Sequence, residues 1–174
     1  MIDEIAHGLI DAWLTAYDAM CRHRNNVLTF TDHGFTLLFD LASPENPDVD
    51  DRLVAAYGLS TPSPARRDAG RIKGFLGGGI DIPGKGRYDK GHALAHAIGG
   101  GLDANLFPQR PDLNRGRSEA GKRYRGMERH AGEHPGTFVY SRLIYNDDTW
   151  VPCALEYGVR LPDGEMWVEL FDNT

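Results

Sequence analysis

Residues 88–116 read YDKGHALAHAIGGGLDANLFPQRPDLNRG, a stretch rich in glycine, histidine and amide side chains. His92 stands near its start, a run of three glycines follows, and Asn105, Gln109 and Asn114 come after the glycines. A packed hydrophobic core does not require this combination, because polar groups buried without partners cost free energy. The stretch is therefore the candidate functional segment of the chain.

The composition is that of an ordinary globular chain, with 174 residues of which 41% are hydrophobic. This length suits one domain, or one domain with a small extension. No apolar run is long enough for a membrane span, and the first residues lack the basic and apolar regions of a secretory signal. The two cysteines favour a reducing compartment. We expect no membrane partner, and a location in the cytoplasm of the producing cell or export without a cleavable signal peptide.

Charge is distributed unevenly along the chain, whose net charge is −6. Residues 66–129 hold fourteen Lys and Arg against seven Asp and Glu, whereas the remainder holds five against eighteen. A basic middle between acidic flanks indicates a surface for phosphate groups. The alternative, a helix near 117–129 with a charged solvent face, accounts for several of these residues but not for the whole imbalance.

Hydrophobic periodicity and turn residues predict a mixture of helices and strands. Apolar residues recur at three- and four-residue steps over the first twenty residues, which predicts an amphipathic helix. Ser118 is placed to cap a second long helix that runs to about His130. The other predicted elements are a hairpin over 27–39, a short helix over 48–57, short strands at 70–76 and near 87–88, and an antiparallel meander over 137–171. The fold class is therefore α+β.

The residue types in 88–116 suit metal-assisted hydrolysis of a phosphodiester. Histidine titrates near neutral pH, so His92 is a natural base, and Asn114 offers a neutral oxygen to Mg²⁺. Lys90, Arg110 and Arg115 are nearby cations for phosphate. Each residue also has a structural alternative, since a single histidine in a glycine-rich loop, or an asparagine in a turn or cap, is commonly structural. A zinc site on His92 and His96 lacks a third ligand at a suitable spacing.

Taken in order, DKGH at 89–92, NLFPQ at 105–109 and LNRG at 113–116 resemble the DNA/RNA non-specific endonucleases. These are ββα-metal (His-Me finger) nucleases related to endonuclease G. Their pattern is Asp-Arg-Gly-His, then Asn-x-x-Pro-Gln, then Leu-Asn-x-Gly. The resemblance covers roughly residues 70–160, and the paired glycines after the histidine are similar to a bacterial subgroup that includes toxin domains.

The resemblance implies a role for each matching residue. His92 would be the general base, and Asn114 would be the protein ligand of Mg²⁺, for which Mn²⁺ can substitute. Asp89 would be a carboxylate beside this pair. Asn105 would brace the histidine-bearing loop against the helix, and Gln109 would help to position that segment.

Three further assignments follow from the same resemblance. Glu128 would correspond to the glutamate that holds metal-bound water, with Glu119 as the competing candidate. Lys90 stands where the family has arginine, so it keeps the catalytic cation but lacks the two-pronged guanidinium. Three arginines are candidates for phosphate binding: Arg87, Arg110 and Arg115.

The implied protein is an α+β nuclease with a ββα-metal core and an antiparallel sheet. Residues 65–174 would form the nuclease domain, and residues 1–64 an acidic helix-and-hairpin extension packed on it. Its partners would be DNA, RNA or both, cleaved to 5′-phosphate ends, and an inhibitor (immunity) protein. One alternative is a weakly active or inactive module that binds nucleic acid or protein on the same scaffold. In another, the acidic N-terminal part masks the basic surface.

Overall fold

The computed structural model describes residues 2–21, 26–42, 49–63 and 80–174, with side chains from Ala6 onward. The helices are α1 (Ile2–Met20), η1 (His96–Ile98), η2 (Asp103–Asn105), α3 (Pro111–Asn114) and α4 (Glu119–Glu133). The strands are β1 (Val27–Asp32), β2 (Phe35–Asp40), β3 (Arg52–Leu59), β4 (Ile80–Ile82), β5 (Gly86–His92), β6 (Leu106–Gln109), β7 (Phe138–Ile144), β8 (Ala154–Arg160) and β9 (Met166–Asp172). Within these ranges, none of the helices combines the length and apolar character that a bilayer-spanning segment needs.

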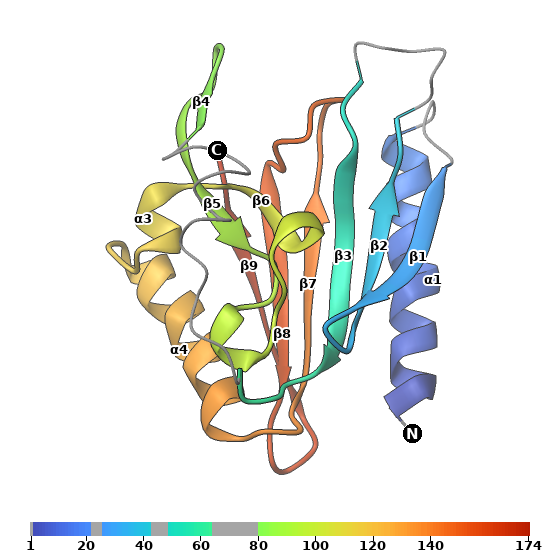
Figure 1. Ribbon diagram of the computed structural model, residues 1–174, viewed down its shortest axis with the longest axis vertical. Helices are drawn as coiled ribbons and strands as arrows, with labels where there is room; N and C mark the ends of the chain where they lie inside the picture. Colours follow the sequence, from blue (N-terminus) through green and yellow to red (C-terminus); the bar gives the residue numbers. More distant parts are fainter. Residues whose placement is uncertain (1, 22–25, 43–48, 64–79) are drawn as a thin grey trace.

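A six-stranded sheet in the order β1-β2-β3-β7-β8-β9 forms the centre of the molecule (Figure 1). Every neighbouring pair is antiparallel. Strands β3 and β7 are neighbours, with Ala55 opposite Arg142 and Leu59 opposite Phe138. The segment that carries β4 to α4 is therefore an insertion between two adjacent strands of one sheet. The predicted α+β class, with antiparallel strands, is confirmed.

Strands from both predicted parts of the chain share this sheet. β1, β2 and β3 come from residues 1–64, whereas β7, β8 and β9 come from residues 65–174. The division at residue 64 stays a prediction. If it holds, the two parts are joined by a continuous β-ladder and not only by packed side chains.

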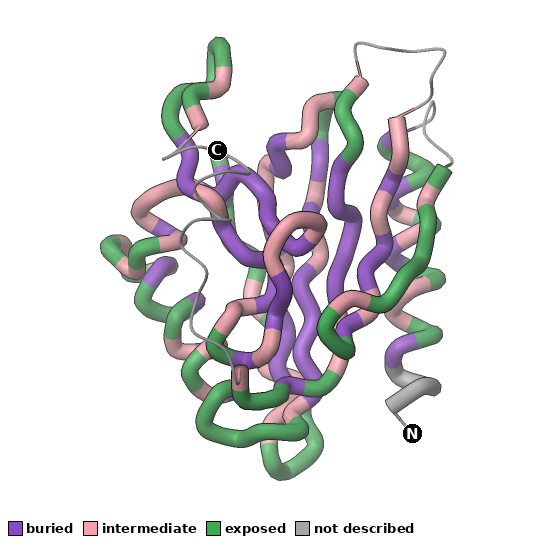
Figure 2. The backbone as a smooth tube through the Cα atoms, viewed as in Figure 1, coloured by how far each residue is buried: buried purple, intermediate pink, exposed green. Residues whose placement is uncertain are grey.

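Helices cover opposite faces of the central sheet. Trp13 of α1 packs on Tyr140, with ring centroids 4.8 Å apart, and Tyr124 of α4 packs on Tyr157 at 5.1 Å. Tyr140 lies opposite Gly158, so Tyr157, the residue before Gly158, faces the other side of the sheet. The central strands are consequently buried along much of their length (Figure 2).

Four predicted elements are confirmed. The first helix is α1, the first hairpin is β1–β2, and the C-terminal meander is β7–β8–β9. The hairpin turn has the positive φ angles of a type I′ turn, 52° at His33 and 84° at Gly34. The second long helix is α4, and its predicted cap Ser118 accepts a hydrogen bond of 3.0 Å from the main-chain nitrogen of Gly121.

The predicted helix over 48–57 is wrong, because strand β3 begins at Arg52. Leu53, Val54, Ala55 and Ala56 are all buried, and β3 pairs with β2 on one side and β7 on the other. A strand buried on both faces has a continuous apolar run, which periodicity cannot distinguish from a buried helix. The predicted strand at 70–76 lies outside the described residues.

A smaller antiparallel sheet, in the order β4-β5-β6, lies beside α3 and α4 (Figure 1). Asp89 of β5 pairs with Gln109 of β6, and His92 pairs with Leu106. The predicted strand near 87–88 is confirmed as part of β5. This sheet therefore brings the two halves of the candidate segment together.

Arg52 is a buried cation at the start of β3. Its Nε donates to the hydroxyl of Tyr17 at 2.7 Å, and Nη1 donates to the carbonyl oxygens of Asp147 and Thr149 at 2.7 and 2.8 Å. Tyr17 in turn donates to Asp40 at 2.5 Å. Burial, and then the hydrogen bond with Asp40, raise the pKa of Tyr17, so its hydroxyl stays protonated. Buried charges need such partners, and this chain of contacts joins α1 to three other parts of the fold.

The variant Tyr17→Phe tests this network, because it keeps the ring and removes the hydroxyl between Asp40 and Arg52. We expect the free energy of unfolding to fall by about 1–3 kcal/mol, since two buried polar groups lose a partner. Urea denaturation measures this loss. Thr15→Ala is the control: its exposed hydroxyl donates to Asp11 on α1, and its loss should cost no more than about 0.5 kcal/mol. Equal losses in the two variants would contradict the expectation.

Candidate functional site

Asn105 ties the loop that follows β5 to the start of β6. Its side-chain nitrogen donates to the carbonyl oxygens of Leu94 and Gly101, both at 2.8 Å, and its side-chain oxygen accepts from the Leu94 amide at 3.0 Å. Its main-chain carbonyl accepts from Ala93 at 2.8 Å. All these partners belong to the loop that follows His92. Asn105 therefore fixes the shape of that loop by bonding to its main chain.

Close packing explains the glycine run after η1. Gly99 has a φ of 97°, which side chains disfavour. A Cβ at Gly100 would overlap the carbonyl oxygen of Leu94, and a Cβ at Gly101 would overlap the carboxylate of Asp32. Asp32 ends β1, so the N-terminal hairpin packs directly on the loop that carries the predicted site residues.

His92 is the last residue of β5, and this residue is 6% exposed. The hydroxyl of Tyr124 on α4 donates to its carbonyl oxygen at 3.2 Å, so α4 holds the end of β5 in place. Alternation along the strand puts Lys90 and His92 on one face and Asp89 on the other. The Nε2 atom of the His92 imidazole is buried.

The carboxylate of Asp89 joins β5 to the end of α3. The side-chain nitrogen of Asn114 donates to Oδ2 at 3.0 Å, and Arg115 makes a two-point contact at 2.7 and 2.5 Å. Burial raises the pKa of Asp89, but the hydrogen bonds from Arg115 and Asn114 outweigh it, and the pKa lies below its ordinary value. Asp89 is thus an anion that only accepts hydrogen bonds. This assigns the nitrogen of Asn114 to the contact and leaves the amide oxygen facing away from it.

Further cations surround Asn114. The charge of Arg117 helps to lower the pKa of Asp89, and Arg125 of α4 donates to the main-chain carbonyl of Asn114 at 3.2 Å. Arg115 is 44% exposed, whereas Asp89 is 10% exposed at its side chain. The outer surface of this cluster is therefore basic, and its one central acid is buried.

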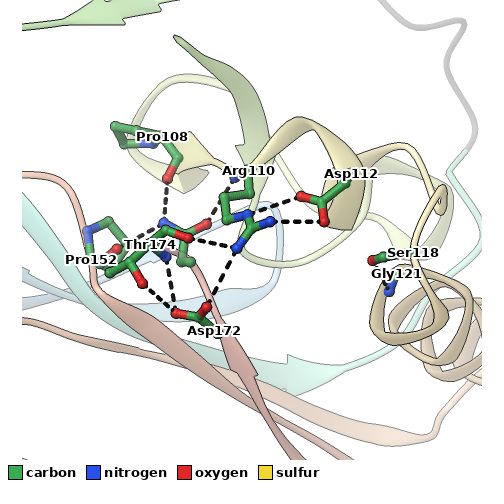
Figure 3. Close-up of polar contacts among 9 residues, drawn as sticks. Pro108, Arg110, Asp112, Ser118, Gly121, Pro152, Asp172 and Thr174 are labelled. Carbon is green, nitrogen blue, oxygen red and sulfur yellow. Dashed lines mark hydrogen bonds and ion pairs between the residues drawn. The ribbon is translucent and has the colours of Figure 1, made fainter. Parts of the chain in front are cut away.

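Arg110, a predicted phosphate ligand, lies at the other end of α3 and makes contacts within the chain (Figure 3). Its guanidinium bonds Asp112 at 3.0 and 3.1 Å, Asp172 at 3.4 Å and the carbonyl oxygen of Thr174 at 2.5 Å. The structure thus places Arg115, and not Arg110, beside Asn114.

Asn173 is a site neighbour that the sequence reasoning missed. It is fully buried and bonds the main chain of Pro108 and of Arg110, on both sides of Gln109. An asparagine that follows the last strand of a meander matches no local motif. Only the tertiary contact between β9 and the β6–α3 connection identifies it.

The two glutamate candidates lie in different surroundings. Glu119 is exposed and bonded to Lys122 at 2.6 Å, a contact that lowers the pKa of Glu119. Glu128 lies close enough to Tyr124 that its charge, second to burial, raises the pKa of that tyrosine. Tyr124 bonds the carbonyl of His92, so Glu128 acts on a residue that contacts the end of β5.

The remaining predicted residues are spread along the β4–β5–β6 sheet. Gln109 is buried against Gly91, where a Cβ would overlap its side chain. Lys90 is partly buried, which lowers its pKa. Arg87 is exposed and lies 4.0 Å from Asp81, near the β4–β5 turn. Gln109 also reaches Tyr124 of α4, whose pKa its hydrogen bond lowers against the larger effect of burial. Gln109 therefore lies between β5 and α4.

The described residues contain no group of three or more His, Cys, Asp or Glu side chains placed to hold a metal. A structural zinc centre within them is therefore unsupported. A hydrated Mg²⁺ on one amide oxygen would not form such a group, since Mg²⁺ keeps several of its waters.

Comparisons with known proteins do not identify a family for this chain. No protein-family model matches the sequence, and no curated protein matches it significantly. Among solved structures, the chain is similar to the Sda1 nuclease with a bound zinc ion, with 14% sequence identity and a TM-score of 0.44. The match covers 87% of this chain and 75% of that chain. A similarity at this level carries no inference about function.

Replacing Asn105 with alanine should loosen the loop that follows His92. Three main-chain groups of Leu94 and Gly101 lose their partner, so we expect a loss of at least about 2 kcal/mol in the free energy of unfolding. We also expect faster hydrogen exchange at the amide of Leu94. The control Asn146→Ala changes an exposed loop residue and should leave both quantities nearly unchanged. Unaltered exchange at Leu94 in Asn105→Ala would show that other contacts hold the loop.

Proposed function

We propose that this chain is a Mg²⁺-dependent endonuclease that hydrolyses phosphodiester bonds of DNA, RNA or both. The observation that carries the proposal is the contact between Asp89 and Asn114. It fixes the amide of Asn114 by its nitrogen and presents the amide oxygen, a ligand type that Mg²⁺ accepts. The residues present therefore fit this metal. In this proposal β5, β6 and α4 are the two strands and the helix of the ββα-metal core.

The order of residues along 89–116 supports the same function through its resemblance to the DNA/RNA non-specific endonucleases. In the proposed reaction, the imidazole of His92 takes a proton from a water molecule as the water oxygen attacks phosphorus. The bond from phosphorus to the 3′ oxygen breaks, the 3′ oxygen gains a proton from solvent, and a 5′-phosphate remains. Bound Mg²⁺ supplies charge stabilisation for the phosphate.

Surface charge supports a polyanionic substrate. Arg115 and Arg117 lie around the buried carboxylate of Asp89, where they can attract backbone phosphates. Phosphate contacts carry no base information, so we propose cleavage without sequence specificity. Glu128 is our choice over Glu119 for the outer surroundings of the metal, because Glu119 is exposed and paired with Lys122.

The direct test is incubation of plasmid DNA and of total RNA with the purified protein in Mg²⁺ or in EDTA. We expect cleavage that requires Mg²⁺, produces 5′-phosphate ends and falls by about 100-fold or more in His92→Ala, which removes the base. Asn114→Ala should lose activity at low Mg²⁺. Asn146→Ala, in an exposed loop, serves as the control and should match the unaltered protein.

The alternative binding module makes a different prediction for the same assay. Folded protein that binds nucleic acid but shows no cleavage with Mg²⁺ or Mn²⁺ at low salt would overturn the nuclease proposal and support that alternative. If cleavage persists in His92→Ala, the nuclease proposal stands, but His92 is not the base.

Binding of DNA should weaken as salt rises, because phosphate contacts release counterions. Measured in EDTA, the slope of log affinity against log salt should fall by about one unit in Arg117→Ala if this side chain contacts one phosphate. Arg142→Ala is the matched control, since Arg142 lies on the central sheet beside Glu156 and should leave the slope unchanged. Equal slopes for the unaltered protein and both variants would show that Arg117 does not contact a phosphate.

A further inference from the structure

Asn114 sits on a helix too short to hold its own shape. α3 contains only Pro111–Asn114, and a helix of one turn is not stable by itself, because fixing its main chain costs more conformational entropy than its few hydrogen bonds return. The amide of Asn114 donates to the carbonyl of Arg110 at 2.9 Å, which closes this turn. The turn is also held from its C-terminal side, where the amides of Arg115 and Arg117 donate to the carbonyls of Pro111 and Asp112. On its N-terminal side, the position of Asn114 depends on what fixes the main chain at Arg110.

Asn173, the residue after β9, fixes that main chain through its side chain. Its side-chain oxygen accepts from the amide of Arg110 at 2.9 Å. Its side-chain nitrogen donates to the carbonyl oxygens of Pro108 at 3.0 Å and Pro152 at 2.8 Å. Its main-chain amide donates to the carbonyl oxygen of Cys153 at 2.9 Å. One fully buried side chain thus joins the residue after β9, the segment just before β8 and the β6–α3 connection. Its partners Pro108, Arg110 and Pro152 are labelled in Figure 3.

The pairing of β5 with β6 does not itself hold Arg110. The β5–β6 ladder ends at the pair Asp89 and Gln109, so Arg110 is the first residue beyond it. The neighbouring contacts of the Arg110 guanidinium with Asp112 and Asp172 are 38–66% exposed, and exposed ion pairs stabilise little. The buried amide of Asn173 is therefore the stronger constraint on this connection.

We propose that Asn173 is a positioning residue for the metal ligand Asn114, acting through the main chain of Arg110. This inference rests on the proposed nuclease function. Asp89 holds the amide of Asn114, and Asn173 holds the turn from which that amide projects. In this proposal, loss of the Asn173 contacts loosens the turn and weakens the alignment of the ligand oxygen, even while Asp89 still holds the amide nitrogen.

The test compares Asn173→Ala with Tyr140→Phe, which removes a side-chain hydrogen bond to Glu156 on the α1 face of the sheet. We expect Asn173→Ala to raise the Mg²⁺ concentration for half-maximal cleavage by about tenfold, the lower end of what outer contacts of metal ligands contribute. The KM for DNA at saturating Mg²⁺ should not change. Hydrogen exchange at the amides of Arg110 and Asn114 should accelerate. Tyr140→Phe should match the unaltered protein in all three measurements.

An unchanged Mg²⁺ requirement in folded Asn173→Ala, with the unaltered protein active, would overturn the positioning role and leave the nuclease proposal intact. If the unaltered protein shows no cleavage, the nuclease proposal fails, and hydrogen exchange still decides whether Asn173 holds the turn. Unchanged exchange at Arg110 and Asn114 would reject that role. Should Asn173→Ala not fold, Asn173→Ser, which keeps a hydroxyl, is measured in the same way with the same criteria.

Discussion

The carboxylate of Asp89 is the contact on which the arrangement of the candidate site depends. It is buried, it remains charged, and it takes hydrogen bonds from two consecutive residues, Asn114 and Arg115. A buried anion without these donors would be strongly unfavourable, so the requirement to satisfy it draws the end of α3 onto β5. The same contact neutralises the acid, so that the exposed surface around it stays basic. One electrostatic constraint thus serves both the packing of the segment and its attraction for phosphate.

Local sequence was sufficient to predict those elements whose residue patterns fit only one kind of secondary structure. The three- and four-residue apolar spacing up to Met20, the Asp-His-Gly turn and the cap at Ser118 each predicted what the structure contains. The failure at 52–59 has a physical cause: a strand buried on both faces loses the alternation that marks strands. Asn105, chosen from a motif, lies where its amide satisfies three main-chain groups. Asn173 could not be chosen in this way, since its importance comes wholly from contacts distant in sequence.

The N-terminal part of the chain is more closely integrated than a masking segment would need to be. β1, β2 and β3 belong to the central sheet, and the carboxylate of Asp32 packs on Gly101 in the loop after η1. Removing residues 1–64 would therefore expose the edge of β7 and take away the packing of Asp32 on the loop. The proposal that acidic N-terminal residues mask a basic surface is better examined by neutralising exposed acids on α1, which leaves the sheet complete.

The clamp at Asn173 has a consequence for how the protein is made. A ribosome completes the turn that carries Asn114 about 60 residues before it adds Asn173, which corresponds to several seconds at ordinary rates of synthesis. During that interval the β7–β8–β9 part of the sheet is still being made, so the insertion between β3 and β7 has no finished sheet to rest on. A nascent chain would thus carry every residue of the candidate site and still lack its final geometry. The order of synthesis delays completion of the site until the fold itself is complete.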